Sequence, residues 1–224
     1  MTTISKTTLD FLKELKNNNN REWFNDHKAE FQVEQKKAKE FYAEVMESLK
    51  THDDIESVKI FRIYRDVRFS KDKTPYKPHF AGNFVRATKR LRGGYYLRIR
   101  PGESFLAGGF WDPNKEDLLR IRKEFEMDAT EIRDIINDKT FVKYFGKLEG
   151  NELKTAPRGF DKEHPDMDLI KMKQFIVTRY FSDEEVLNPN FLEELNKTYK
   201  AMRPYFDYMS EILTTDLNGE SLID

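Results

Sequence analysis

The sequence predicts an α+β fold, in which a mainly antiparallel sheet is covered by N- and C-terminal helices. Three observations support this class. Helical patterns occupy the first and last parts of the chain, β-rich runs occupy the middle, and no helical segment separates those runs. Without intervening helices, neighbouring strands pair through hairpins rather than parallel crossovers. We expect a single α+β domain over residues 1–216 and a frayed C-terminal tail at 217–224.

The first third of the chain predicts helices. Ser5 or Thr7 can cap a first helix, whose apolar residues over 9–15 share one face. An asparagine-rich stretch at 17–20 ends this helix. The segments expected next are a short turn at 20–24, capped by Asn20, and a long amphipathic helix at about 26–49.

The middle of the chain predicts strands, because β-branched and aromatic residues alternate with turn residues. A Pro101-Gly102 turn favours a hairpin between the last two runs. The expected strands are 59–64, 79–88, 95–100 and 104–110.

Helical patterns resume in the last part of the chain. Asp112 or Asn114 can cap the first of these helices, and Pro204 is expected to break or kink the last one. The expected elements are helices at 115–125, 130–136 and 141–148, a polar loop at 151–168, a strand at 175–181 and a helix at 190–213.

Composition excludes several classes of function. The 39 basic and 40 acidic residues nearly cancel, which argues against broad nucleic-acid binding but leaves room for a local basic patch. Cysteine is absent, which removes disulfides, thiolate metal sites and cysteine nucleophiles. No apolar run is long enough for a membrane span or a signal peptide, so we expect a cytoplasmic, soluble protein without a membrane partner. The oligomeric state stays open.

The segment 61–80, FRIYRDVRFSKDKTPYKPHF, is the strongest candidate for a functional site, because it combines basic, acidic and aromatic side chains. In an extended chain Arg62, Asp66 and Arg68 would share one face with Ile60 and Tyr64, so we expect Arg62 to be partly buried. Trp111 and His164, which lie outside this segment, are two further candidates. The ligand-binding candidates are Arg62, Arg65, Asp66, Arg68, Asp72, Lys73, Tyr76, His79, Trp111 and His164.

Each candidate also has a structural interpretation. The arginines can hold an anion in a pocket, or they can pair with Asp66, Asp72 and helix carbonyls as an internal tie. Tyr76 can line a ligand site or plug a packed turn. The glycine pair at 108–109 favours a tight turn over a ligand cradle. The cluster Asp161, His164, Asp166 and Asp168 matches no zinc or calcium loop, so we interpret it as a solvated loop and assign no metal.

The arginine segment resembles the signature of the bacterial family called domain of unknown function 2461. The similar residues are Arg62, Arg65-Asp66, Arg68-Phe69, Asp72-Lys73, Tyr76, Arg21-Glu22-Trp23-Phe24, Gly94-Tyr95-Tyr96, Gly108-Gly109-Phe110-Trp111, Pro157-Arg158-Gly159-Phe160-Asp161 and His164-Pro165. The resemblance spans nearly the whole chain. It implies a stand-alone bacterial protein without an assigned activity, and it supplies no catalytic residues or cofactor.

Three functional hypotheses follow from these residues. The first is a protein that binds a small phosphate-bearing ligand through the Arg/Lys cluster. The second is a phosphoester hydrolase that uses Asp66, Asp72 or His164 as an acid or base. The third is a structural or interaction protein, whose arginines are fully paired with carboxylates.

Overall fold

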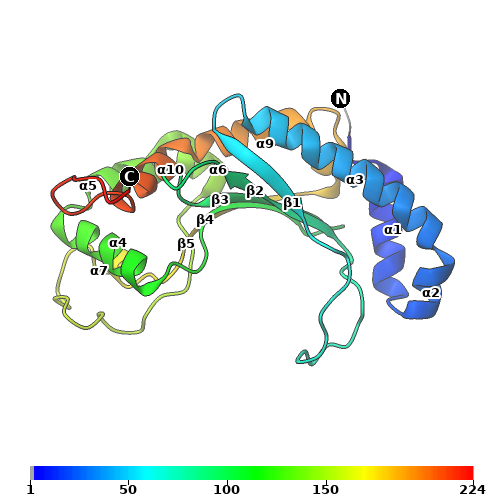
Figure 1. The fold of residues 1–224 in the computed structure, drawn as a ribbon, viewed down its shortest axis with the longest axis horizontal. Coiled ribbons are helices and arrows are strands. Elements are labelled where there is room, and N and C mark those ends of the chain that lie inside the picture. The colour runs from blue at the N-terminus through cyan, green and yellow to red at the C-terminus, as the bar shows by residue number, and fades with distance from the viewer. Residues whose placement is uncertain (1–2, 224) are drawn as a thin grey trace. The chain divides into compact units, whose positions relative to one another are not determined.

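A computed structural model describes residues 3–223. Within this range the strands form one five-stranded antiparallel sheet with the order β1-β2-β3-β4-β5, and helices precede and follow it in the chain (Figure 1). The predicted α+β class is therefore confirmed. The strands are β1 (Ile55–Ile60), β2 (Phe80–Arg86), β3 (Gly94–Ile99), β4 (Ser104–Phe110) and β5 (Phe175–Phe181).

β4 and β5 have the predicted bounds, β3 is shifted by one residue, and β2 lies inside its predicted range. Only the first strand is displaced. The first strand was predicted at 59–64, but β1 ends at Ile60. Its strand-forming residues begin earlier, at Ile55, and regular pairing stops where the basic segment starts. Arg62 therefore follows the sheet rather than lying within it.

The helices start at the capping residues that the sequence indicated. The side chains of Ser5, Asn20 and Asn114 each accept a hydrogen bond from a backbone N–H in the first helical turn. The helices are α1 (Lys6–Asn17), α2 (Arg21–Asp26), α3 (Lys28–Leu49), α4 (Lys115–Met127), α5 (Thr130–Asn137), α6 (Lys139–Phe145), α7 (Met167–Ile170), α8 (Asp183–Leu187), α9 (Phe191–Ala201) and α10 (Arg203–Ile212). The short α7 and α8 were not predicted. Pro204 lies at the start of α10, where the predicted long C-terminal helix is broken.

The described chain divides into two compact units, each built from three stretches of sequence. The first unit comprises Met1–Val85, Tyr96–Leu106 and Tyr180–Lys197, and the second comprises Arg86–Tyr95, Ala107–Arg179 and Thr198–Asp224. The prediction of a single domain over 1–216 stays a prediction.

In the first unit, α3 covers one face of the strands. Tyr42 of α3 is fully buried, and its hydroxyl donates to the carbonyl of Leu97 at 3.0 Å and contacts that of Phe80 at 3.2 Å. The ring of Phe41 stacks on Phe191 with centroids 5.9 Å apart. On the other side of α3, the buried carboxylate of Glu34 accepts a hydrogen bond from Thr8 of α1 at 2.6 Å. These contacts fix the strands that carry the candidate site.

In the second unit, α10 supplies three buried aromatic residues, Tyr205, Phe206 and Tyr208. Tyr205 and Phe206 are fully buried, and the Tyr205 hydroxyl donates to the carbonyl of Phe175 in β5 at 2.8 Å. Gly109 of β4 has a φ of 131°, and a Cβ there would lie 2.1 Å from that same carbonyl oxygen. Glycine is therefore required for the close approach of β4 to β5.

Within residues 3–223, no helix has the length and apolar character needed to cross a bilayer.

Candidate functional site

The segment 61–79 continues the β1–β2 hairpin beyond the sheet and is drawn in teal in Figure 1. Its two arms stay joined by backbone hydrogen bonds from Arg65 to Pro75 at 2.9 Å and from Lys77 to Ile63 at 2.8 Å. A bridge between Tyr64 and Tyr76 lies between these bonds. The arms therefore form an antiparallel ladder, and residues 66–74 form its tip.

Tyr76 anchors this extension to the N-terminal helices. It is 4% exposed, and its ring stacks on Phe24 of α2 with centroids 3.9 Å apart. Burial raises the pKa of the Tyr76 hydroxyl. The backbone of Tyr76 is hydrogen-bonded to the side chain of Asn19, in the turn between α1 and α2. Of the two interpretations of Tyr76, this geometry supports the plug of a packed turn.

Arg65 and Asp72 form an ion pair across the tip. The Arg65 guanidinium also donates to the Thr74 hydroxyl, and the Asp72 carboxylate accepts from the backbone N–H of Thr74 at 2.9 Å. The guanidinium, followed by the hydrogen bonds from Thr74, lowers the pKa of Asp72 to about 2. This pair gives the tip its shape.

Three other polar residues at the tip, Asp66, Arg68 and Lys73, make contacts within it. The Arg68 guanidinium donates to the Asp66 carboxylate at 2.6 Å, and this contact lowers the pKa of Asp66. The ammonium group of Lys73 donates to the carbonyl of Val67 at 2.9 Å. Asp66, Arg68 and Lys73 are all exposed. These contacts match the interpretation of the segment as an internally paired tie.

The predicted burial of Arg62 is wrong. Arg62 is exposed, whereas its neighbour Ile63 is 3% exposed. The alternation of faces places Ile63 inward, so Arg62 and Tyr64 point outward. Within residues 3–223 the Arg62 side chain makes no hydrogen bond or ion pair. Its positive charge still acts on Lys77, because the pKa of Lys77 is lowered first by burial and then by the charge of Arg62.

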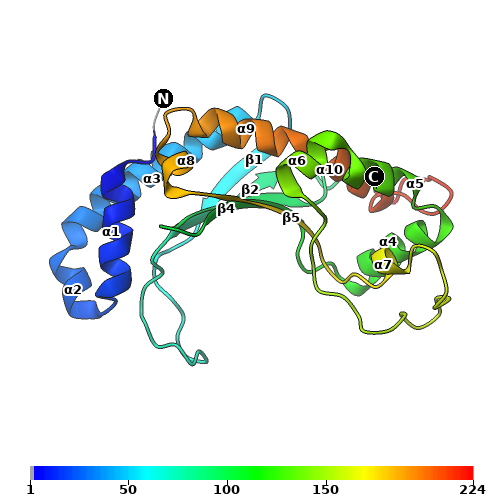
Figure 2. The ribbon, with the colours of Figure 1, turned by 180° about the vertical axis from the view of Figure 1, so that it is seen from behind.

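A second group of cations lies on the face of the first unit's strands opposite α3. Along β3, Tyr95, Leu97 and Ile99 are buried, so Tyr96, Arg98 and the following Arg100 share the other face. In Figures 1 and 2, α3 lies on one side of these strands, and none of the drawn helices of this unit lies beneath them. We call Lys77, His79, Arg98 and Arg100, with Tyr96 and Phe105, the cationic face.

Arginine dominates the charge of the cationic face. The Glu103 carboxylate lies 3.1 Å from the Arg100 guanidinium and 3.5 Å from that of Arg98. Within the described range, Glu103 is the carboxylate that forms ion pairs with these two arginines. The ammonium group of Lys77 lies over the Phe61 ring at 5.8 Å. The face therefore carries a surplus of positive charge.

His79 lies among these cations. Burial, followed by the charges of Arg98 and Arg100, lowers the pKa of His79 to about 4, so its ring is neutral at pH 7. Its Nδ1 is buried and has no hydrogen-bond partner in the described structure. The Nε atoms of Arg98 and Arg100 are also buried and also have no hydrogen-bond partner in the described structure. Three neighbouring nitrogens are thus buried without partners.

Aromatic rings extend along the same face. Neighbouring ring centroids are separated by 6.4 Å from Phe61 to Tyr96, 5.4 Å from Tyr96 to Phe105, and 5.6 Å from Phe105 to Tyr180. The Arg98 guanidinium lies 4.3 Å from the centroid of Phe105. Flat rings and guanidinium planes together suit a ligand with both a planar group and a negative charge.

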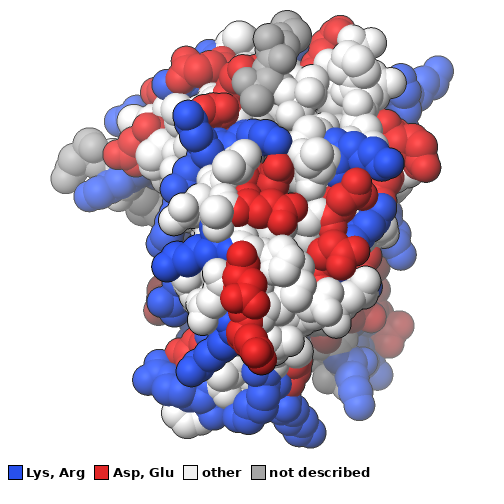
Figure 3. Space-filling view, turned by 90° about the vertical axis from the view of Figure 1, so that its right-hand side faces the viewer, with Lys and Arg blue, Asp and Glu red and all other residues white. Residues whose placement is uncertain are grey.

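The surface view shows a local concentration of basic side chains. In Figure 3, Lys and Arg gather at the lower edge of the view, and others lie along its left side and at its upper right, while Asp and Glu occupy the middle. Basic side chains are therefore locally concentrated on this side although the net charge of the chain is nearly neutral.

Trp111 and His164 belong to the second unit, whereas the residues of segment 61–79 belong to the first. Trp111 is 71% exposed. His164 is held by its loop, because its Nε2 contacts the carbonyl of Glu126 at 3.1 Å and its Nδ1 accepts from the N–H of Asp166 at 3.1 Å. Asp166 also accepts a hydrogen bond from Arg133 at 2.6 Å. These contacts give His164 a structural role in the loop at 151–168.

Sequence reasoning included His79 but did not single out Arg98, Arg100 or Phe105. The available signal was the spacing Tyr96-x-Arg98-x-Arg100 within a predicted strand, because residues two apart share one face. The sequence does not show which cations lie beside His79.

The fold and this face define an α+β protein with a cationic and aromatic surface on one side of its sheet. The chain belongs to the family described as "Conserved hypothetical protein (DUF2461)", whose family model matches residues 7–208. The resemblance drawn from the arginine segment is thereby confirmed. No curated protein and no solved structure matches the chain.

Proposed function

We propose that this protein binds a small phosphate-bearing ligand on the cationic face. The observation that carries this proposal is the group of buried nitrogens without partners, namely His79 Nδ1, Arg98 Nε and Arg100 Nε. Leaving a buried donor unpaired costs about 1–3 kcal/mol, and more for a charged group. An oxyanion that reaches these atoms removes this cost and supplies the missing negative charge.

The chemistry of each group suits a phosphate. A guanidinium donates two parallel hydrogen bonds to an oxyanion, and the Nε–H is one of the donors on that edge. The neutral His79 ring offers one donor and one acceptor, so it can bind either a charged or a protonated phosphate oxygen. Lys77, whose ammonium group forms no ion pair with a carboxylate within residues 3–223, adds a further positive charge.

The segment 61–79 contributes to this proposal in two ways. Its base holds Lys77 and His79 beside Arg98, and Arg65 adds to the positive potential that acts on His79. Its tip residues Arg68 and Lys73 remain ligand-binding candidates, but their contacts within the tip favour a shaping role.

The other two hypotheses receive unequal support. Asp66 and Asp72 are bound to arginines, and His164 is bound within the second unit, so no contact favours these residues as the acid or base of a hydrolase. The internally paired tip is compatible with a purely structural role for that part of the segment. It does not account for the unpaired nitrogens of the cationic face.

The row of four rings favours a second candidate, a single-stranded nucleic acid. Bases stack on exposed sheet aromatics at about 1–3 kcal/mol each, while basic groups hold the phosphates. Tyr180, at the end of the row, is 66% exposed and open to stacking.

Isothermal titration calorimetry tests both candidates with inorganic phosphate, a set of mononucleotides and sugar phosphates, and short single-stranded oligonucleotides. We expect saturable binding that Arg98→Gln and Arg100→Gln each weaken by about tenfold or more. Arg158→Gln is the matched control, because Arg158 is exposed and belongs to the second unit. Binding should also weaken as salt is added.

The same titrations separate the outcomes. Tight binding of mononucleotides or sugar phosphates supports the small-ligand proposal, and affinity that rises with oligonucleotide length supports the second candidate. Absence of binding by every phosphate compound, or equal binding by wild type and both arginine variants, contradicts the proposed site. Melting temperatures of the variants show that they are folded.

A further inference from the structure

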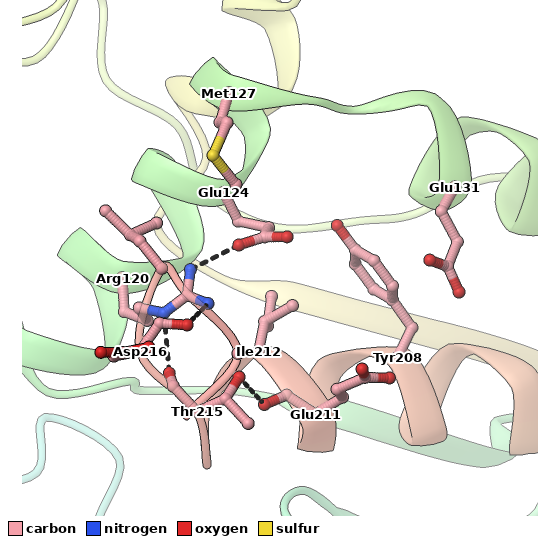
Figure 4. A pocket seen from close by; sticks show the side chains of 11 residues that line it. Arg120, Glu124, Met127, Glu131, Tyr208, Glu211, Ile212, Thr215 and Asp216 are labelled. Carbon is pink, nitrogen blue, oxygen red and sulfur yellow. Dashed lines mark hydrogen bonds and ion pairs between the residues drawn. The ribbon is translucent and has the colours of Figure 1, made fainter. Parts of the chain in front are cut away.

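The second unit contains a pocket of about 120 Å³ that is separate from the cationic face. Helices α4, α5 and α10 and the turn after α10 supply its walls (Figure 4). The turn at 214–222 is closed by a backbone hydrogen bond from Leu222 to Thr214 at 2.8 Å. The pocket is therefore built from ordered elements rather than from a single loop.

The lining of this pocket is acidic. Glu131 and Glu211 line it with carboxylates that make no ion pair within residues 3–223. Glu124 is paired with Arg120 at 2.6 Å. The same Arg120 guanidinium donates to the carbonyls of Thr215 at 3.0 Å and of the next residue at 3.1 Å, so its hydrogen bonds hold the wall of the pocket. Negative charge remains in excess.

Tyr208 provides an independent indication of a ligand. Its side chain is only 6% exposed in total, and its hydroxyl is buried without a hydrogen-bond partner in the described structure. Figure 4 shows this hydroxyl directed toward the space between Glu124 and Glu131. Buried hydroxyls normally have a partner, because leaving one unpaired costs free energy. A hydrogen-bonding group is missing from this position, and the acidic lining favours one that donates.

We propose that this pocket binds the ammonium group of a small aliphatic amine. The ammonium carries three donors, which match the Tyr208 oxygen and the carboxylates of Glu124 and Glu131. The apolar side chains of Met127 and Ile212 line the same pocket and can contact an aliphatic stem.

A bare metal ion fits the described residues less well. Among residues 3–223, no group of three or more His, Cys, Asp or Glu side chains is arranged to hold a metal ion. A calcium ion takes six to eight oxygen ligands, whereas an ammonium needs only three acceptors and tolerates an apolar wall.

Calorimetry with n-butylammonium, 1,4-diaminobutane and agmatine tests this inference, with n-butanol as the uncharged counterpart. We expect the wild-type protein to bind at least one of the amines saturably and not to bind the alcohol. Glu131→Gln and Tyr208→Phe should each weaken binding by about tenfold. Asp134→Asn makes the same charge change on the exposed surface of α5, outside the pocket lining, and should leave binding unchanged.

Tyr208→Phe also has a stability readout that does not depend on the ligand. Since it removes an unpaired buried hydroxyl, the free protein should melt at the same or a higher temperature than wild type. Absence of saturable binding by all three amines overturns the proposal, as does binding that neither pocket variant weakens. Binding of calcium without binding of amines overturns it too. None of these outcomes bears on the phosphate titrations.

Discussion

The side-chain amide of Asn19 forms hydrogen bonds with both the carbonyl and the N–H of Tyr76. Its Nδ2 donates to the Tyr76 carbonyl at 2.9 Å, and its Oδ1 accepts from the Tyr76 N–H at 3.1 Å. The two residues are 57 positions apart in the chain. This pairing imitates one step of a β-ladder and ties the turn between α1 and α2 to the extension of the β1–β2 hairpin.

Asn19→Ala should therefore lower the free energy of unfolding by about 1–2 kcal/mol, because both Tyr76 backbone groups lose their partner. Urea unfolding measures the change. Asn17→Ala, an exposed change in the same asparagine run, is the control and should cost less than 0.5 kcal/mol, a range typical of surface positions. Equal losses in the free energy of unfolding of the two variants would show that the Asn19–Tyr76 hydrogen bonds contribute nothing to stability.

Arg62→Ala should change the free energy of unfolding by about 0.5 kcal/mol or less, because Arg62 is exposed and makes no ion pair in the described range. Tyr76→Ala, in the facing arm, should cost about 3–5 kcal/mol because it empties a buried aromatic site. Chemical denaturation of both variants checks this contrast. A large loss for Arg62→Ala would mean that the guanidinium is desolvated after all.

Stability should fall as the pH is lowered, and His79 should contribute to the fall. The pKa of His79 is depressed from 6.5 to about 4 in the folded protein, so between these values the unfolded chain binds more protons. The contribution is fully present above pH 6.5 and is lost progressively as the pH falls. From pH 7.5 to pH 5 the loss amounts to about 2 kcal/mol.

Denaturation of wild type and of His79→Gln at these two pH values isolates the contribution of His79 from that of the other histidines. The variant should lose less stability on acidification. An NMR titration should give a pKa well below 6.5 for the His79 ring, and phosphate should raise it because an anion favours the imidazolium. A His79 pKa near 6.5 without phosphate would remove the expected pH effect.

Gly109→Ala should destabilise the protein by about 3 kcal/mol or more, because the new Cβ would lie 2.1 Å from the Phe175 carbonyl oxygen and the φ of 131° is strained for alanine. Gly102→Ala is the matched control: its φ is also positive, at 71°, but nothing lies within 4 Å of the new Cβ. Thermal unfolding of the two variants should rank them in this order. The reverse order would refute the role of close strand packing.

Most of the fold follows from local signals in the sequence. Side-chain caps at Ser5, Asn20 and Asn114 start helices where expected, and alternating runs define β4 and β5 at their predicted bounds. Such signals depend on residues a few positions apart, which the sequence shows directly. The short α8 was missed because a five-residue helix has too little periodicity to be recognised.

The candidate site was harder to predict, because it depends on which charges meet. The sequence shows many arginines near two aspartates, but not that Arg65 and Arg68 pair with Asp72 and Asp66 within the tip. Nor does it show that Arg98 lies beside His79. Pairing across strands is set by tertiary packing, so spacing along the chain does not reveal it.

The division of the chain into interleaved stretches limits how the protein can be dissected. A contiguous fragment that contains all of the first unit must run from residue 1 to 197, and one that contains all of the second must run from 86 to 224. These ranges share residues 86–197, so no single cleavage point yields two complete halves. Deletion mapping of either proposed activity would therefore mislead, and point substitution in the full-length chain is the appropriate route.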